Sequence, residues 1–155
     1  MSEVTLSPAT PEHVPAIKAL LEVHRLPTAE LEDWLEHFVV AERHGRLIGC
    51  GGLELYADDS VGLVRSMAVE GDLHGAGVGR LILEWVEAHG SELGLRRLFL
   101  FTVDAAPFYE RFGYELVGLD AFPPSARRSW QYRIVQRRGE EWGVIAMAKD
   151  MSTSG

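Results

Sequence analysis

The strongest sign of chemistry in this sequence is a glycine-rich stretch between an expected strand and an expected helix. Residues 74–80 read His-Gly-Ala-Gly-Val-Gly-Arg and directly precede a long amphipathic pattern. Glycine lets the backbone turn tightly and leaves its N–H groups accessible. The N-terminus of a helix adds free N–H donors and a partial positive charge. We therefore expect this stretch to bind an anion, and a pyrophosphate suits it best.

The spacing of the glycines separates this stretch from two common nucleotide-binding loops. A Walker loop needs a lysine directly after its last glycine, and here Arg80 follows Gly79. A dinucleotide loop needs the spacing G-x-G-x-x-G and follows the first strand of a parallel unit. This stretch instead follows the fourth expected strand, so neither loop is favoured.

Two charged residues lie on strands that are otherwise apolar. Glu54 stands between two leucines, so its side chain points away from theirs, toward either solvent or a cleft. Arg65 interrupts an apolar strand that leads to the glycine-rich stretch. Its planar guanidinium either binds a substrate carboxylate or pairs with Asp58 or Asp59 at the sheet surface.

The elements that must position these residues follow from hydrophobic periodicity. Their order is β-α-α-β-β-β-α-β-α-β-β, which predicts an α/β fold with a central mixed sheet and helices on both faces. The length predicts one domain over residues 1–155. We expect Pro27 to end the first helix and Gly113 to cap a short later helix. The expected strands are 4–6, 38–41, 46–55, 61–69, 98–103, 114–117 and 144–149, and the expected helices are 10–26, 31–38, 78–94 and 106–111.

Composition and charge exclude several classes of protein. The net charge of −8 argues against nucleic acid as a partner, because phosphate binding needs a basic face. No run is long enough to span a membrane and no signal-peptide pattern opens the chain, so we expect a cytoplasmic protein with no membrane partner. The single cysteine, Cys50, is expected to pack in the core, and no metal site is expected. Residues 127–138 carry five arginines and no acid, which indicates either a solvated loop or an electropositive wall beside a bound anion.

Two motifs in this order resemble the signatures of the GNAT acyltransferases. The first covers residues 74–79, with His74 where the family has Gln or Arg. The second comprises Thr102, Ala105, Phe108, Tyr109, Gly113 and Tyr114, with Thr102 where Asn is common. The resemblance extends from Val4 to Met151 and implies acetyl-CoA, bound as co-substrate. The residues that it implies for binding coenzyme A are Met67, Ala68, Val69, His74, Gly75, Ala76, Gly77, Val78, Gly79, Arg80, Thr102 and Phe108.

The resemblance also implies a reaction, in which the amine of a small molecule attacks acetyl-CoA directly in a ternary complex. Backbone donors at Met67 and Val69 would stabilise the oxyanion. Tyr109 would protonate the leaving thiolate or donate a hydrogen bond to it, unless it serves only for packing. Glu54 is expected to be the general base, directly or through water. Arg65 is the expected clamp for the acceptor.

The acceptor is expected to be an amino acid or a similar compound. Residues 26–31 and 36–42 resemble small acetyltransferases encoded near arsenic-resistance genes, and residues 63–66 and 106–109 also resemble short amino-acid acetyltransferases of the N-acetylglutamate synthase kind. Residues 122–142 match least well and are a candidate lining of the acceptor pocket. The alternatives are a peptide or protein amine as acceptor, a non-catalytic acyl-CoA sensor, and a dinucleotide-binding module. The resemblance also suggests a homodimer.

Overall fold

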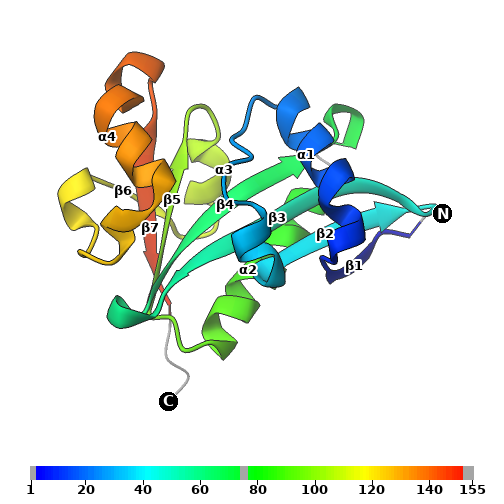
Figure 1. Ribbon diagram of the computed structural model, residues 1–155, viewed down its shortest axis with the longest axis horizontal. Helices are drawn as coiled ribbons and strands as arrows, with labels where there is room; N and C mark the ends of the chain where they lie inside the picture. Colours follow the sequence, from blue (N-terminus) through cyan, green and yellow to red (C-terminus); the bar gives the residue numbers. More distant parts are fainter. Residues whose placement is uncertain (1–2, 74–76, 152–155) are drawn as a thin grey trace. The chain divides into compact units, whose positions relative to one another are not determined.

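The computed structural model describes residues 3–73 and 77–151 (Figure 1). These residues form two compact units. One unit holds residues 3–53, 65–73 and 77–90, and the other holds residues 54–64 and 91–151. Strands β3 (Arg46–Tyr56) and β4 (Val61–Val69) contribute to both. That the chain acts as one domain stays a prediction.

One seven-stranded sheet runs through the chain in the strand order β1-β2-β3-β4-β5-β7-β6. Strand β4 pairs with β5 (Arg97–Thr102) in parallel, whereas the pairs β1–β2, β2–β3, β5–β7 and β6–β7 are antiparallel. The predicted α/β fold with a mixed sheet is therefore confirmed. In the described part of the chain, no helix is both long and apolar enough to cross a membrane.

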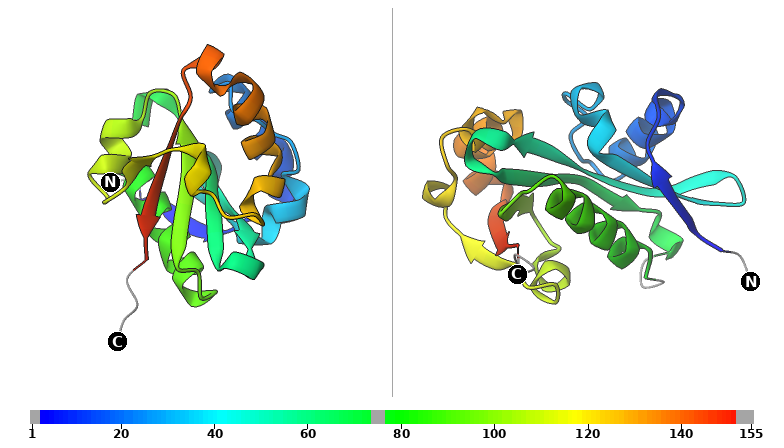
Figure 2. Two further views of the ribbon diagram at one scale, coloured as in Figure 1. Left: turned by 90° about the vertical axis from the view of Figure 1, so that its left-hand side faces the viewer. Right: turned by 90° about the horizontal axis from the view of Figure 1, so that it is seen from below.

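The first unit contains β1 (Thr5–Pro8), β2 (Phe38–Arg43), and parts of β3 and β4, covered by helices on both faces. Helix α1 (Val14–Val23) packs through Ile17, Leu20 and Leu21 against a cluster that includes Val40 and Cys50. Helix α2 (Val78–Glu92) lies on the opposite face (Figure 2). A six-residue 3-10 helix, Glu32–His37, stands where an α-helix over 31–38 was expected.

Three glycines of β3 allow close packing on both faces of the first unit. A Cβ added at Gly49 or Gly51 would lie 2.9 or 2.6 Å from Ile82 of α2, and one added at Gly52 would lie 2.3 Å from the Phe38 ring. Successive residues of a strand point to opposite faces, so Gly51 serves the α2 face and Gly52 the other. Because these glycines of β3 lack a Cβ atom, they leave space for the side chains that cover the sheet.

Replacing Gly52 with Ala tests this packing. The added methyl overlaps the fully buried Phe38 ring, so we expect the variant to lose about 1–3 kcal/mol of unfolding free energy. Gly71→Ala is the matched control, because an added Cβ there meets no atom within 4 Å. Thermal unfolding followed by circular dichroism compares the two variants, and equal melting temperatures would contradict the packing argument.

Helix α1 ends earlier than the sequence predicts, and not because of Pro27. Arg25 adopts a left-handed conformation with φ +58°. Its N–H donates to the Glu22 carbonyl at 3.1 Å, and the N–H of Leu26 donates to the Leu21 carbonyl at 2.9 Å. This pair of bonds is a Schellman motif, which ends the helix at Val23.

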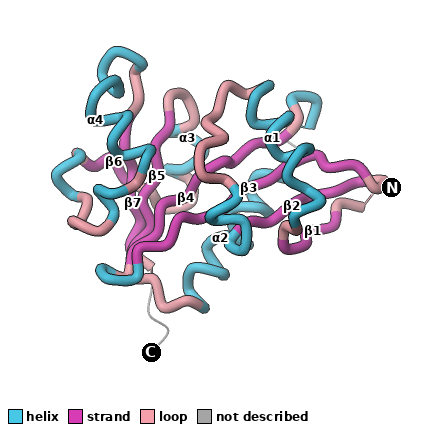
Figure 3. The backbone as a smooth tube through the Cα atoms, in the orientation of Figure 1, coloured by secondary structure: helices cyan, strands magenta, loops and turns pink. Residues whose placement is uncertain are grey.

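The second unit contains β5, β6 (Glu115–Val117) and β7 (Ile145–Asp150), with helices α3 (Ala106–Glu110) and α4 (Trp130–Trp142). Strand β7 lies between β5 and β6, and α4 precedes it along the chain (Figure 3). The expected order lacked this helix, so that part of the prediction is wrong. Helix α4 is anchored by aromatic rings: Phe122 stacks on Phe99 at 4.3 Å and contacts Tyr132 of α4 in a tilted arrangement at 5.2 Å, measured between ring centroids.

The predicted cap at Gly113 is confirmed. Gly113 has φ +92°, its N–H donates to the Glu110 carbonyl at 3.1 Å, and the N–H of Tyr114 donates to the Tyr109 carbonyl at 3.2 Å. Glycine suits this left-handed position because it has no Cβ. The cap fixes the end of the short helix that carries Tyr109.

Candidate active site

Strand β4 carries a backbone irregularity at Ser66, next to Arg65. Ser66 has φ +58°, a conformation that few residues other than glycine adopt. A left-handed residue within a strand interrupts the pleat and turns neighbouring backbone groups away from the regular ladder, as bulges beside active sites do. Met67, Ala68 and Val69 follow directly and complete the strand. The irregularity therefore lies just before the backbone donors that the sequence predicted.

Arg65 is a buried cation with a fixed orientation in the first unit. Its side chain is 4% exposed. Its Nε donates to the Ser66 hydroxyl at 3.0 Å and one Nη donates to the Pro27 carbonyl at 3.5 Å. The guanidinium also lies 5.9 Å from the centre of the Phe38 ring, within range of a cation–π interaction. Asp58 and Asp59, the alternative partners named from the sequence, contact Arg128 and Ser125.

Cys50 is buried in the core, as predicted, and lies beside the same irregularity. Its thiol is buried and donates to the Ser66 carbonyl at 3.3 Å. Burial raises the pKa of the Cys50 thiol to about 12. The thiol therefore stays neutral near pH 7, and a neutral thiol is a poor nucleophile.

The glycine-rich stretch ends at an exposed helix N-terminus. Gly77 has φ +85°, and its carbonyl accepts from the N–H of Leu81 at 3.1 Å, the first bond of α2. An added Cβ at Gly77 meets no atom within 4 Å. The predicted residues Val78, Gly79 and Arg80 form the first turn, whose N–H groups have no partner within a helix. Arg80 is exposed and lies 3.8 Å from Glu84, whereas His74, Gly75 and Ala76 lie outside the described residues.

Tyr109 lies in the second unit, within a group of aromatic rings. It is buried, and its ring centroid lies 5.1 Å from that of Phe108 and 5.7 Å from that of Tyr114. Burial raises the pKa of the Tyr109 phenol to about 12. Thr102, predicted to bind coenzyme A, accepts a hydrogen bond from the Ala105 N–H at 3.1 Å and so holds the turn that leads into α3.

Glu54 is the centre of a buried hydrogen-bond network in the second unit. Its side chain is 1% exposed, so the solvent-facing alternative is wrong. One carboxylate oxygen accepts from the Tyr56 hydroxyl at 2.5 Å and from the Ser129 hydroxyl at 2.6 Å. The other oxygen accepts from the Gln131 amide at 3.0 Å. The carboxylate thus joins strand β3 to the N-terminus of α4.

Sequence reasoning missed Tyr56, Ser129 and Gln131. The signal that was present is local: Ser129 is a preferred N-cap residue, and its side chain accepts from the Gln131 N–H at 3.1 Å. The five arginines of residues 127–138 favour a solvated loop or an electropositive surface beside an anion. The sequence therefore does not predict a helix in this segment. Two of the arginines make local contacts, Arg127 with the Phe122 carbonyl and Arg138 with Glu141. A third, Arg128, contacts Asp58, which is distant in sequence.

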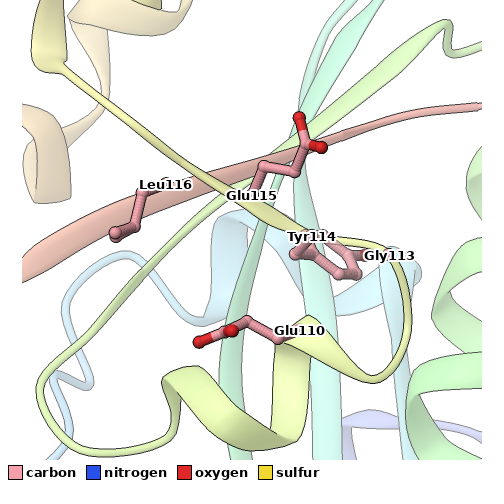
Figure 4. A pocket seen from close by; sticks show the side chains of 5 residues that line it. All are labelled: Glu110, Gly113, Tyr114, Glu115 and Leu116. Carbon is pink, nitrogen blue, oxygen red and sulfur yellow. The ribbon is translucent and has the colours of Figure 1, made fainter.

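A surface pocket of the second unit holds none of the predicted site residues. Glu110, Gly113, Tyr114, Glu115 and Leu116 line it. The two carboxylates extend to different sides of the Tyr114 ring (Figure 4). Among the residues that the structure describes, no group of three or more His, Cys, Asp or Glu side chains could hold a metal ion.

The structure therefore brings the predicted residues together in two groups. The first unit holds Arg65, Met67, Ala68, Val69 and the start of α2, and the second holds Glu54, Thr102, Phe108 and Tyr109. The first group combines a strand irregularity with a helix N-terminus, and the second combines a buried carboxylate with a neutral phenol.

Comparisons with known proteins agree on the family. Residues 34–116, more than half of the chain, match the model of the acetyltransferase (GNAT) domain. The amino-acid acetyltransferase of Pasteurella multocida (strain Pm70) is 24% identical over 143 residues, which cover 88% of this chain and 32% of that protein. The chain thus spans about a third of that relative's length.

Two solved structures show the same fold. N-acetylglutamate synthase from Neisseria gonorrhoeae, complexed with coenzyme A and N-acetyl-glutamate, superposes with a TM-score of 0.81 at 21% identity, covering 99% of this chain and 36% of that one. Rv2747 from Mycobacterium tuberculosis, in complex with CoA and NLQ, superposes with a TM-score of 0.78 at 23% identity, covering 96% of this chain and 99% of that one.

The described residues fit the co-substrate of this family. Gly77 leaves open space at the start of α2, whose first N–H groups have no partner within the helix, and this suits a diphosphate. The left-handed residue at Ser66 precedes the strand end at which backbone donors are expected. The chain belongs to the GNAT acetyltransferase family.

Proposed function

We propose that the acceptor is an amino acid or an amino-acid-like compound whose carboxylate binds Arg65. The observation that carries this proposal is the burial of the Arg65 guanidinium beside Ser66, with Nε and one Nη oriented by oxygen acceptors. A planar guanidinium forms paired hydrogen bonds with a carboxylate, which a lysine cannot reproduce. The name of the Pasteurella relative, amino-acid acetyltransferase, supports the same class of acceptor.

The proposed reaction is direct transfer in a ternary complex. Acetyl-CoA supplies an activated thioester. Arg65 orients the acceptor, whose amine forms the new C–N bond as the C–S bond breaks. The backbone N–H groups of Met67 and Val69 stabilise negative charge on the carbonyl oxygen. The amine proton must leave, and the sulfur must be stabilised as it departs.

Glu54 is the proposed final acceptor of the amine proton. Because its side chain is almost fully buried, the proton reaches it through an intervening water rather than by direct contact. The Tyr56, Ser129 and Gln131 donors fix the carboxylate in one orientation. Fixed orientation favours proton transfer because no reorganisation is needed in the transition state.

Tyr109 is proposed to donate a hydrogen bond to the leaving sulfur. Its pKa of about 12 keeps the phenol neutral throughout the physiological range. A phenol with that pKa is a poor acid toward a thiolate whose thiol has a pKa of about 8.5, so a hydrogen bond is favoured over full proton transfer. The same value predicts that no loss of activity below about pH 10 comes from ionisation of Tyr109.

Tyr109→Phe tests this role. We expect kcat to fall about 10- to 100-fold while the KM of acetyl-CoA stays nearly unchanged, because one hydrogen bond to a developing charge is removed. Steady-state kinetics with a thiol reagent measures both constants. Tyr132→Phe is the control, since it removes another buried hydroxyl of the same unit. An unchanged kcat would show that Tyr109 serves only for packing.

A panel of acceptors tests the function as a whole. Release of coenzyme A from acetyl-CoA is followed with free amino acids, their decarboxylated analogues and short peptides. We expect turnover with carboxylated amino acids and little with the analogues. Turnover with peptides alone would show that the acceptor is a peptide or protein amine. No turnover with any acceptor, together with coenzyme A binding, would support the sensor alternative.

A further inference from the structure

The N-terminus of helix α4 is built around the carboxylate of Glu54. Ser129 is almost fully buried and has two roles at once. Its oxygen accepts from the Gln131 N–H at 3.1 Å, which caps the helix, and its hydroxyl donates to Glu54 at 2.6 Å. The Gln131 side chain then donates to the second oxygen of Glu54 at 3.0 Å. One helix end thus contacts both carboxylate oxygens.

Helix polarity adds to these contacts. The 13-residue helix α4 has the partial positive charge of its N-terminus on the side where Glu54 lies. Negative charge at a helix N-terminus is favourable, and the two donors come from the start of the helix. The arrangement therefore fixes the orientation of the carboxylate.

We propose that Ser129 and Gln131 are positioning residues for Glu54, so that helix α4 sets the orientation of the group that receives the amine proton. The proposal rests on the role of Glu54 in the proposed function. Neither residue needs to contact substrate, since each acts through Glu54. The N-terminal end of α4 would then support the proton acceptor from outside the reacting groups.

Ser129→Ala is the first test. Removing the hydroxyl is expected to lower kcat about 10-fold, because small errors in the placement of a reacting group reduce rates strongly. The KM values of acetyl-CoA and of the acceptor should stay within about twofold, since the substitution touches neither substrate. Ser129→Thr keeps a hydroxyl and should restore most of kcat. Gln131→Leu should lower kcat without removing the cap.

Ser125→Ala is the matched control. Ser125 is also buried and donates to a carboxylate, but its partner is Asp59 at 2.5 Å. The substitution should lower the melting temperature as much as Ser129→Ala does and leave kcat unchanged. Equal reductions of kcat in the two variants would overturn the proposal, as would failure of Ser129→Thr to restore activity.

A double-mutant cycle separates this proposal from the role of Glu54 itself. On a Glu54→Gln background, Ser129→Ala should cause no further reduction of kcat, because the group that it positions is gone. Independent, multiplicative reductions would overturn the positioning role alone. A Glu54→Gln variant with the kcat of the original chain would instead overturn the role of Glu54. A raised acceptor KM with unchanged kcat would show that α4 serves acceptor binding and contradict the proposal.

Discussion

Gly77→Asp is expected to weaken coenzyme A binding severely. Gly77 stands directly before the first turn of α2 and has open space where a side chain would project. A carboxylate there repels the diphosphate that this helix end is proposed to bind. Two like charges about 5 Å apart interact by ~3 kcal/mol at an effective dielectric constant of about 20. We therefore expect the dissociation constant to rise on the order of 100-fold or more, measured by titration calorimetry.

Gly77→Asn separates charge from backbone strain. Gly77 has φ +85°, and Asn and Asp are the side chains that tolerate left-handed backbone best. The Asn variant has nearly the same shape as the Asp variant without the charge, so it should bind coenzyme A much more tightly. If the affinity of Gly77→Asp for coenzyme A stays within about threefold of the original, the glycine-rich stretch is not part of the binding site.

The parts of the fold that the sequence predicted depend on local signals. The long helix after the glycines, the left-handed cap at Gly113 and the buried packing of Cys50 each follow from residues close in sequence. Periodicity and glycine placement report directly on such features. The family match over residues 34–116 covers the same stretch in which these signals are strongest.

The features that the sequence did not predict depend on distant contacts. Helix α4 buries only Tyr132 and Gly139 fully, so its apolar period is too sparse to stand out among the arginines. Ser129 meets Glu54 across 75 residues, and no local pattern encodes that contact. The left-handed conformation of Ser66 likewise gives no signal, because serine is common in ordinary strands and loops. Contacts between distant residues decide the Ser129–Glu54 pair and with it the position of α4.

Arg65→Ala tests substrate and mechanism together. If Arg65 binds the acceptor carboxylate, removing a charge-assisted pair of hydrogen bonds should cost about 2–4 kcal/mol, or roughly 30- to 1000-fold in kcat/KM for the acceptor. The KM of acetyl-CoA should be nearly unchanged. Arg65→Lys should also weaken binding of the acceptor, because an ammonium group cannot form the paired hydrogen bonds of the planar guanidinium. Steady-state kinetics with both substrates varied measures these constants.

The structure gives Arg65 partners that a purely structural residue would also have, so the decisive comparison is between acceptors. A decarboxylated analogue should be a poor acceptor for the original enzyme and no worse for Arg65→Ala, because the analogue has no carboxylate for Arg65 to bind. A structural role would lower the melting temperature and impair every acceptor alike. Arg46→Ala is the control for charge: Arg46 is exposed and lies 2.6 Å from Glu70, and surface pairs contribute little. If Arg65→Ala folds normally and prefers the carboxylated acceptor by the original ratio, the carboxylate binds elsewhere, and Arg133 and Arg137 on the exposed side of α4 become the next residues to replace.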